Sequence, residues 1–137
     1  MYTINFWPVL VAAVVSFGIG ALWYSPILFG KEWMTLTKMS DSDMEAAKAR
    51  GMWRSYVVHF IATLISFLVL AFISTTIGIA NAGDGAYIAF LLWLGFVLPI
   101  NVSEYLWKKA PIKLVIIDTV NVLVSLLIGG AIIGAWR

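Results

Sequence analysis

Three ionisable side chains lie inside long apolar stretches of this 137-residue chain, where a charged group is costly and needs a reason to be there. They are His59, Glu104 and Asp118, and two amides, Asn101 and Asn121, lie in the same stretches. An imidazole and two carboxylates can bind a ligand, move a proton or bond to one another between helices. We therefore predict that these five side chains form a ligand or proton site.

The spacing of these groups predicts that they meet in one layer. Four of them, His59, Asn101, Glu104 and Asp118, lie four to seven residues from the nearest basic residue in their own segment. At about 1.5 Å per residue, this places the four about 6–11 Å below one interface. Asp118 and Asn121 are three residues apart and share a helix face. His59, Thr63 and Ser66 share a face in the same way. We predict that these faces meet inside a bundle, with a hydrogen bond between Asp118 and His59.

Simpler roles for the same groups are also open. Polar contacts between helices can serve packing alone, each contributing about 0.6–2 kcal/mol, and Glu104 could pair with Lys108 at the surface. One histidine and two carboxylates are a conceivable metal set, but no HxxxH or ExxH spacing supports it. Cysteine is absent, and no serine has the context of an activated nucleophile. We expect no catalytic residue, no metal, no cofactor and no enzymatic activity.

Four apolar stretches must position these groups. Hydrophobic residues make up 62% of the chain and charged residues 12%, against about half and a quarter in a soluble domain. About 20 apolar residues suffice for a helix to cross a bilayer. The predicted fold is an all-α integral membrane protein, an antiparallel four-helix transmembrane bundle forming a single domain over residues 1–137, with spans at about 4–23, 56–77, 86–107 and 112–136. A net charge of +2 without a basic, aromatic-rich patch argues against nucleic acid as a partner.

The connections carry their own signals. The only long one, Ile27–Arg54, contains a capping box with Ser42 as N-cap and Glu45 three residues later, and Gly51 is a natural stop. This pattern predicts a short amphipathic helix lying along the inner membrane surface. Within the third span, Pro99 removes a backbone hydrogen bond and predicts a kink.

Basic residues are strongly biased to one side of the predicted bundle. Eight of the nine lie in the first and third connections or beside them. Because cytoplasmic loops are enriched in Lys and Arg, we expect both termini on the non-cytoplasmic side. Trp and Tyr mark both interfaces, Tyr2 on the side of the termini, and only Trp93 lies well inside a span. The basic residues on the inner side are Lys31, Lys38, Lys48, Arg50, Arg54, Lys108, Lys109 and Lys113, and the ninth is Arg137.

Small residues repeat at helical spacing in the first and fourth spans. Such faces let helix backbones approach closely. We favour their use within the bundle, and a homo-oligomer built on them stays open. The candidate packing residues are Ala12, Ser16, Gly20, Gly129, Gly130 and Gly134.

A distinctive motif begins in the last turn of the first span and continues beyond it: GALWYSP at 20–26, FGK at 29–31 and WM at 33–34. With the later LWLGFVLP at 92–99, it resembles the domain-of-unknown-function 1761 family, whose members are short bacterial proteins with four expected spans. The resemblance implies a bacterial cytoplasmic (inner) membrane protein but no activity. Physically, the motif is an aromatic interfacial stop, a proline break and a glycine turn. It also suggests one wall of a pocket, made of Trp23, Tyr24, Ser25 and Lys31.

These observations order the possible functions. The polar side chains gather in the inner half of the spans, whereas a conduction path needs polar lining further outward. We therefore expect a non-catalytic membrane protein that binds a small ligand or a partner through its inner polar layer, for instance as an accessory subunit of a membrane complex. The alternative is a small proton-coupled transporter or channel acting as a homo-oligomer. Beyond the lipid bilayer, the expected partners are copies of the chain or the subunits of a larger complex.

Overall fold

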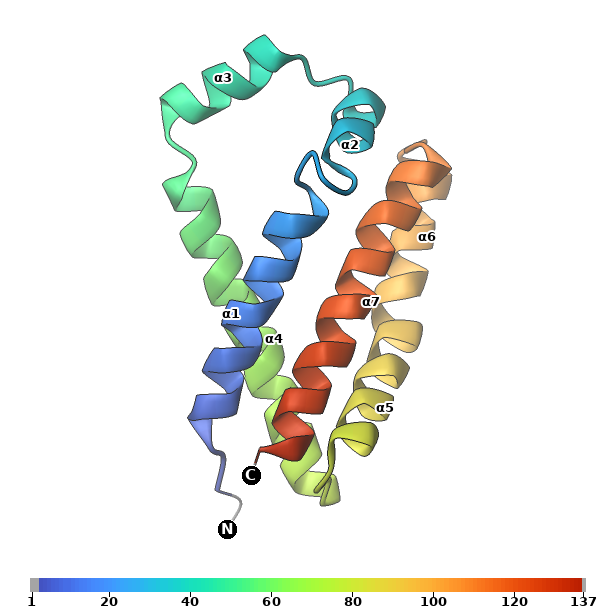
Figure 1. Ribbon diagram of the computed structural model, residues 1–137. Coiled ribbons are helices and arrows are strands. Elements are labelled where there is room, and N and C mark those ends of the chain that lie inside the picture. Colours follow the sequence, from blue (N-terminus) through green and yellow to red (C-terminus); the bar gives the residue numbers. More distant parts are fainter. Residues whose placement is uncertain (1–2, 137) are drawn as a thin grey trace.

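The computed structural model describes residues 3–136, so the predictions that fall on Tyr2 and Arg137 lie outside the described residues. The fold is all-helical over this range, and the predicted membrane bundle is confirmed (Figure 1). Two spans begin at Trp53 and Ala82, slightly earlier than expected. The four helical segments long and apolar enough to cross a membrane are α1 (Phe6–Trp23), α4 (Trp53–Ile77), Ala82–Trp107 and α7 (Ile112–Ala135).

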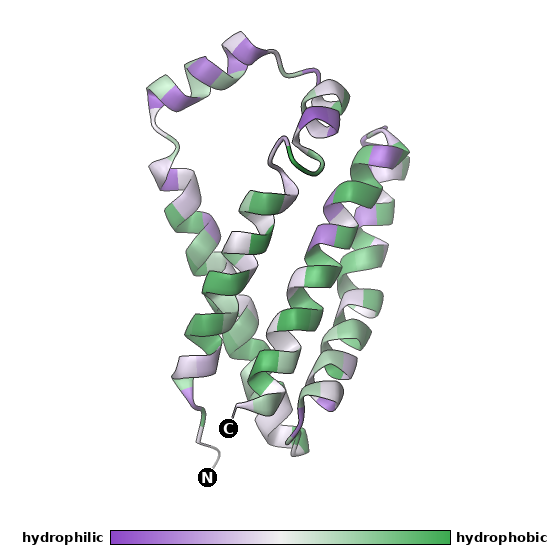
Figure 2. Cartoon of the chain, viewed as in Figure 1, coloured by the Kyte–Doolittle hydropathy of each residue, from purple (hydrophilic) through white to green (hydrophobic). Residues whose placement is uncertain are grey.

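The four spans run alternately up and down, which places the two lysine-rich connections at one end of the bundle (Figure 1). We call this the basic end, and we call the opposite end, where α1 begins and α7 finishes, the terminal end. Figure 2 shows apolar residues along the spans and hydrophilic residues concentrated toward the basic end. The last span, α7, is central: it packs against α1 and against α5 (Ala82–Leu92), while α4 packs mainly on α1.

The apolar core lies in the terminal half of the bundle. Its buried members come from all four spans and contact a ring of partly buried aliphatic and aromatic side chains. Burial of such side chains is what fixes the mutual position of the helices there. The buried core residues are Val9, Ala12, Ala13, Phe67, Leu70, Ala71, Ala89 and Ile133.

Glycines bring α5 and α7 into backbone contact in this terminal half. A methyl group added at Gly130 would lie 2.5 Å from the carbonyl oxygen of Gly85 and 2.7 Å from Cβ of Ala89. A methyl group at Gly134 would strike the carbonyl of Asn81. The α5–α7 contact therefore depends on residues without a side chain, as the small-residue pattern in α7 predicts.

The remaining predicted packing residues divide into two groups. A methyl group at Gly129 would fall on the ring of Phe67, so this glycine seats α4 against α7, and Ala12 is fully buried in α1. Ser16 and Gly20 are only half-buried, and a Cβ at Gly20 would have no neighbour within 4 Å. The small-residue ladder of α1 is thus used for packing at its start and not at its end.

The long connection contains two short helices, α2 (Gly30–Thr37) and α3 (Asp41–Arg50), the second ending at Gly51 as predicted. The predicted N-cap at Ser42 with Glu45 is wrong. Ser40 caps α3 instead: its hydroxyl accepts from the Asp43 N–H (3.1 Å), and its own N–H donates to the Asp43 carboxylate (3.0 Å). That backbone hydrogen bond lowers the pKa of the Asp43 carboxyl.

The register of this cap follows from how α2 ends. Lys38 takes the left-handed conformation (φ 58°) that closes a helix, and Ser40, two residues later, is extended. The apolar face expected on the connection also lies on α2, where Trp33, Met34 and Leu36 are half-buried. In α3 only Met44 and Ala47 are less than fully exposed, so α3 is a polar helix rather than an amphipathic one.

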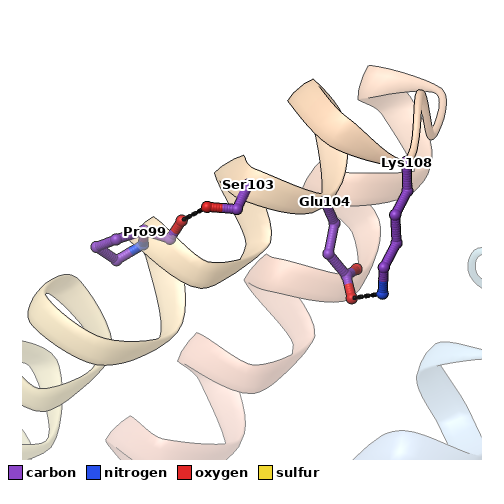
Figure 3. Close-up of polar contacts among 4 residues, drawn as sticks. All are labelled: Pro99, Ser103, Glu104 and Lys108. Carbon is purple, nitrogen blue, oxygen red and sulfur yellow. Dashed lines mark hydrogen bonds and ion pairs between the residues drawn. The ribbon is translucent and has the colours of Figure 1, made fainter.

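The third span accommodates its proline with a π-helical turn. It consists of α5, the turn η1 (Trp93–Val97) and α6 (Leu98–Trp107). The N–H of Leu98 donates to the carbonyl of Trp93, five residues back, immediately before Pro99, which has no N–H to donate. The hydroxyl of Ser103 donates to the Pro99 carbonyl at 3.2 Å (Figure 3). The helix thus continues through Pro99, where the sequence predicts a kink, without ending.

Candidate functional site

One turn of α7 accepts hydrogen bonds from the end of α1. The indole Nε1 of Trp23 donates to the carbonyl of Ile117 at 3.0 Å, and the hydroxyl of Tyr24 donates to Oδ1 of Asp118 at 2.7 Å. Both donors come from the point where α1 stops, because Tyr24 leaves the helical conformation (φ −94°, ψ 12°) ahead of Pro26. The stop that the sequence predicts therefore aims two aromatic side chains at α7.

The same turn of α7 is bonded from its other side by the third span. The indole Nε1 of Trp93 donates to the carbonyl of Thr119 at 3.0 Å, and Nδ2 of Asn101 donates to the Thr119 hydroxyl at 2.8 Å. In a regular α-helix, positions eight residues apart differ by about 80° around the axis. The π-helical turn between Trp93 and Asn101 takes up one extra residue, which brings both side chains toward the face that meets α7.

The next polar residue of α7 adds an acceptor without a donor. Oδ1 of Asn121 is buried, and it has no hydrogen-bond partner among residues 3–136. The Asn121 amide lies close enough to the Tyr24 hydroxyl to interact with it. Within the described part of the chain, the Asp118 carboxylate accepts one hydrogen bond, from Tyr24 to Oδ1, and Oδ2 accepts none. We call the whole group the polar cluster; it comprises Trp23, Tyr24, Trp93, Asn101, Asp118, Thr119 and Asn121.

Aromatic rings form the wall of the polar cluster on the α1 side. The Trp23 and Phe29 rings lie 4.8 Å apart between centroids, and the Tyr24 and Trp33 rings meet edge to face at 6.0 Å. The turn that places these rings requires Gly30, since a Cβ there would collide with the carbonyl of Tyr24. The glycine of the FGK motif therefore has a steric reason, and the motif as a whole builds this wall.

The other two residues predicted for the pocket wall are not part of the aromatic wall. The Ser25 hydroxyl donates to the carbonyl of Leu22 within its own chain segment at 2.7 Å. Lys31 is exposed on α2. A third residue of the same connection does reach the last span: Glu32 forms an ion pair with Lys113 (3.0 Å), which ties α2 to the start of α7.

His59 lies apart from the polar cluster. All of residues 53–59 are exposed, because α4 diverges from the bundle toward the basic end (Figure 1). The nearest ring to the imidazole is Phe17, with centroids 6.1 Å apart. The predicted hydrogen bond between Asp118 and His59 is wrong: Tyr24 is the partner of Asp118. The hydroxyl of Thr63 is satisfied by the His59 carbonyl at 2.8 Å, within α4 itself.

Glu104 makes no hydrogen bond to the cluster, although its carboxylate is close enough to that of Asp118 to interact with it electrostatically. Its carboxylate pairs with Lys108 one turn later at 3.2 Å, and both side chains are exposed (Figure 3). This is the surface pairing that the sequence left open as the simpler role for Glu104. Of the five predicted site residues, the structure thus brings together Asn101, Asp118 and Asn121.

Two members of the cluster, Thr119 and Trp93, are absent from the predicted site. Thr119 gave no signal, because a threonine in a span commonly bonds within its own helix. Trp93 did give a signal in the sequence, because an indole N–H well inside a span needs a hydrogen-bond acceptor. Across residues 3–136, no three His, Asp or Glu side chains lie where they could share a metal ion.

Comparison with known sequences identifies the family. The family model described as protein of unknown function (DUF1761) matches residues 7–134, nearly the whole chain. No curated protein and no solved structure matches the chain. The chain therefore belongs to the DUF1761 family, in agreement with the resemblance of its opening motif.

Proposed function

We propose that this member of the DUF1761 family is a non-catalytic integral membrane protein that binds a small polar ligand in the polar cluster. The observation that carries the proposal is the buried Oδ1 of Asn121, which has no donor among the described residues and lies one turn from the open oxygen of Asp118. A buried acceptor without a donor costs about 1–3 kcal/mol. A ligand that donates a hydrogen bond there removes that cost on binding.

The position of the cluster supports entry from the basic end. Asp118 is six residues into α7, about 9 Å from the start of that helix, and both Asp118 and Asn121 are partly exposed. Under the positive-inside rule the basic end faces the cytoplasm. The proposed ligand therefore comes from the cytoplasmic side, either free or as a side chain of a partner subunit in a larger membrane complex.

Proton-coupled transport by a homo-oligomer is the less favoured function. Beyond the cluster, toward the terminal end, Gly130 and Gly85 meet backbone to backbone, and Phe67 fills the space over Gly129. The buried core of this half is apolar in all four spans, apart from the hydroxyls of Ser74 and Ser125. A path for protons or ions needs polar lining or hydration, which this packing opposes within one copy of the chain.

The proposal is tested on the full-length protein purified in lipid nanodiscs. Native mass spectrometry should find a bound, non-lipid mass on the wild type that is lost in Asp118→Asn and retained in the control Glu45→Gln, whose side chain is exposed on α3. The proposal fails if Asp118→Asn leaves the bound mass in place, or if the wild type carries none. A proton flux in liposomes that Asp118→Asn abolishes would instead establish the transport alternative.

A further inference from the structure

This inference rests on the proposed function and names its ligand class. We propose that the polar cluster selects a small organic cation that carries N–H donors, such as a primary alkylammonium ion. Three independent features of the cluster lead to this class: its unused acceptors, its uncompensated negative charge and its aromatic wall.

The first feature is the balance of donors and acceptors. The two indole N–H groups, the Asn101 amide and the Tyr24 hydroxyl all donate to oxygens of α7. After these bonds are made, Oδ1 of Asn121 and Oδ2 of Asp118 are left as acceptors, while the amide of Asn121 interacts with the Tyr24 hydroxyl. A site with acceptors in excess discriminates in favour of a ligand that brings donors, because any other ligand leaves a buried oxygen unpaired.

The second feature is charge. The described residues form two ion pairs, Lys108 with Glu104 and Lys113 with Glu32, and neither includes Asp118. The lysine nearest to Asp118 in α7 is thus already engaged by the carboxylate of α2. A carboxylate within a membrane span is costly unless a positive charge or a proton compensates it. A cationic ligand supplies that charge, whereas an anion would be repelled.

The third feature is the aromatic wall. Tyr24 provides the hydrogen bond to Asp118 and also packs edge to face on Trp33, while Trp23 lies beside Phe29. Electron-rich aromatic faces attract cations, and tryptophan does so most strongly. A carboxylate next to several aromatic rings is suited to a cation of small size that also has apolar carbon.

The experiment titrates the full-length protein in nanodiscs with ethylammonium, tetramethylammonium and ethanol at constant ionic strength, reading tryptophan emission, since Trp23 and Trp33 lie in the wall. We expect saturable binding of ethylammonium. Tetramethylammonium, a cation without N–H groups, and ethanol, a neutral donor, should each bind about tenfold more weakly or worse. Asp118→Asn and Asn121→Leu should each weaken ethylammonium binding by a similar factor, and Glu45→Gln, at an exposed position of α3, should leave it unchanged.

Two variants of the cluster, Asp118→Asn and Asn121→Leu, are used so that the test remains decisive if one of them fails to fold. Circular dichroism in nanodiscs reports whether each variant is folded. Equal binding of tetramethylammonium would overturn the requirement for N–H donors, and equal binding of ethanol would overturn the requirement for charge. If no cation binds while native mass spectrometry still finds a mass that Asp118→Asn removes, the ligand class is refuted and the proposed function stands. If neither a cation nor such a mass is found, both are refuted.

Discussion

The hydrogen bond from Tyr24 to Asp118 joins the end of α1 to α7 across 94 positions of sequence, and its removal should be measurable. Tyr24→Phe deletes the hydroxyl and keeps the ring that packs on Trp33. A hydrogen bond to a charged group is worth about 1.5–3 kcal/mol in soluble proteins, and bonds between membrane helices average about 0.6 with a maximum near 1.7 kcal/mol. Because this bond is short, at 2.7 Å, and partly buried, we expect a coupling of about 1–1.7 kcal/mol.

A double-mutant cycle measures this coupling. Tyr24→Phe and Asp118→Leu are made singly and together, and the free energy of unfolding is obtained from reversible SDS titration in mixed micelles, followed by circular dichroism. Tyr56→Phe is the control partner, because Tyr56 is exposed on α4 and, among residues 3–136, its hydroxyl bonds only to Met52 of its own segment. The cycle with Tyr56 should be additive within about 0.5 kcal/mol. A coupling between Tyr24 and Asp118 no larger than that of the control would refute the reasoning.

Other predictions concern packing and pH. Gly130→Val should destabilise the bundle by about 1–3 kcal/mol through its clash with Gly85, whereas Gly18→Ala, where a Cβ meets nothing within 4 Å, should change the unfolding free energy by at most about 0.5 kcal/mol in the same SDS titration. The cap of α3 should weaken in acid: the pKa of Asp43 is lowered in the folded state by the Ser40 N–H, so its contribution is present above the unfolded pKa and is lost as the pH falls through the folded value. A lower protection factor for amide hydrogen exchange at the start of α3 in acid, absent in Asp43→Asn, checks this, and a protection factor in the variant that falls with pH as in the wild type would contradict it.

The architecture separates a tightly packed half from an open one. In the terminal half, glycines and small apolar residues bring four helices together. Toward the basic end, α4 diverges and its first residues are exposed, so α1, α7 and the third span hold the polar cluster by hydrogen bonds rather than by apolar packing. Specific polar bonds in a less dense region are compatible with a ligand entering between helices.

Much of the fold follows from the sequence because span length and hydropathy are local properties. The ends of α1 and α7 agree closely with prediction, since Pro26 stops the first helix and Pro111 precedes the last. The cap of α3 was misplaced because two overlapping boxes, beginning at Ser40 and at Ser42, satisfy the same pattern. The left-handed residue that chooses between them is set by the end of the preceding helix, which the capping pattern does not describe.

The site was less predictable, because it depends on the angles at which helices cross. Asp118 and Asn121 share a face of one helix, and that relation needs only the helical period. His59 occupies a comparable depth on α4, yet that helix turns away from α7, so depth alone does not bring the two groups together. The part played by Trp93 depends on a π-helical turn and on a backbone carbonyl, neither of which has a clear signature in hydropathy.

The most direct test of this account asks which side chains meet at Asp118. The chain contains no cysteine, so pairs can be introduced without further changes and treated in native membranes with a short bifunctional thiol reagent. We predict efficient cross-linking in the Tyr24→Cys, Asp118→Cys protein and none in the His59→Cys, Asp118→Cys protein. In each protein a loop between the two cysteines is cleaved, and a cross-link is then detected as a shift in electrophoretic mobility. Cross-linking of the histidine pair, with none in the tyrosine pair, would contradict the polar cluster.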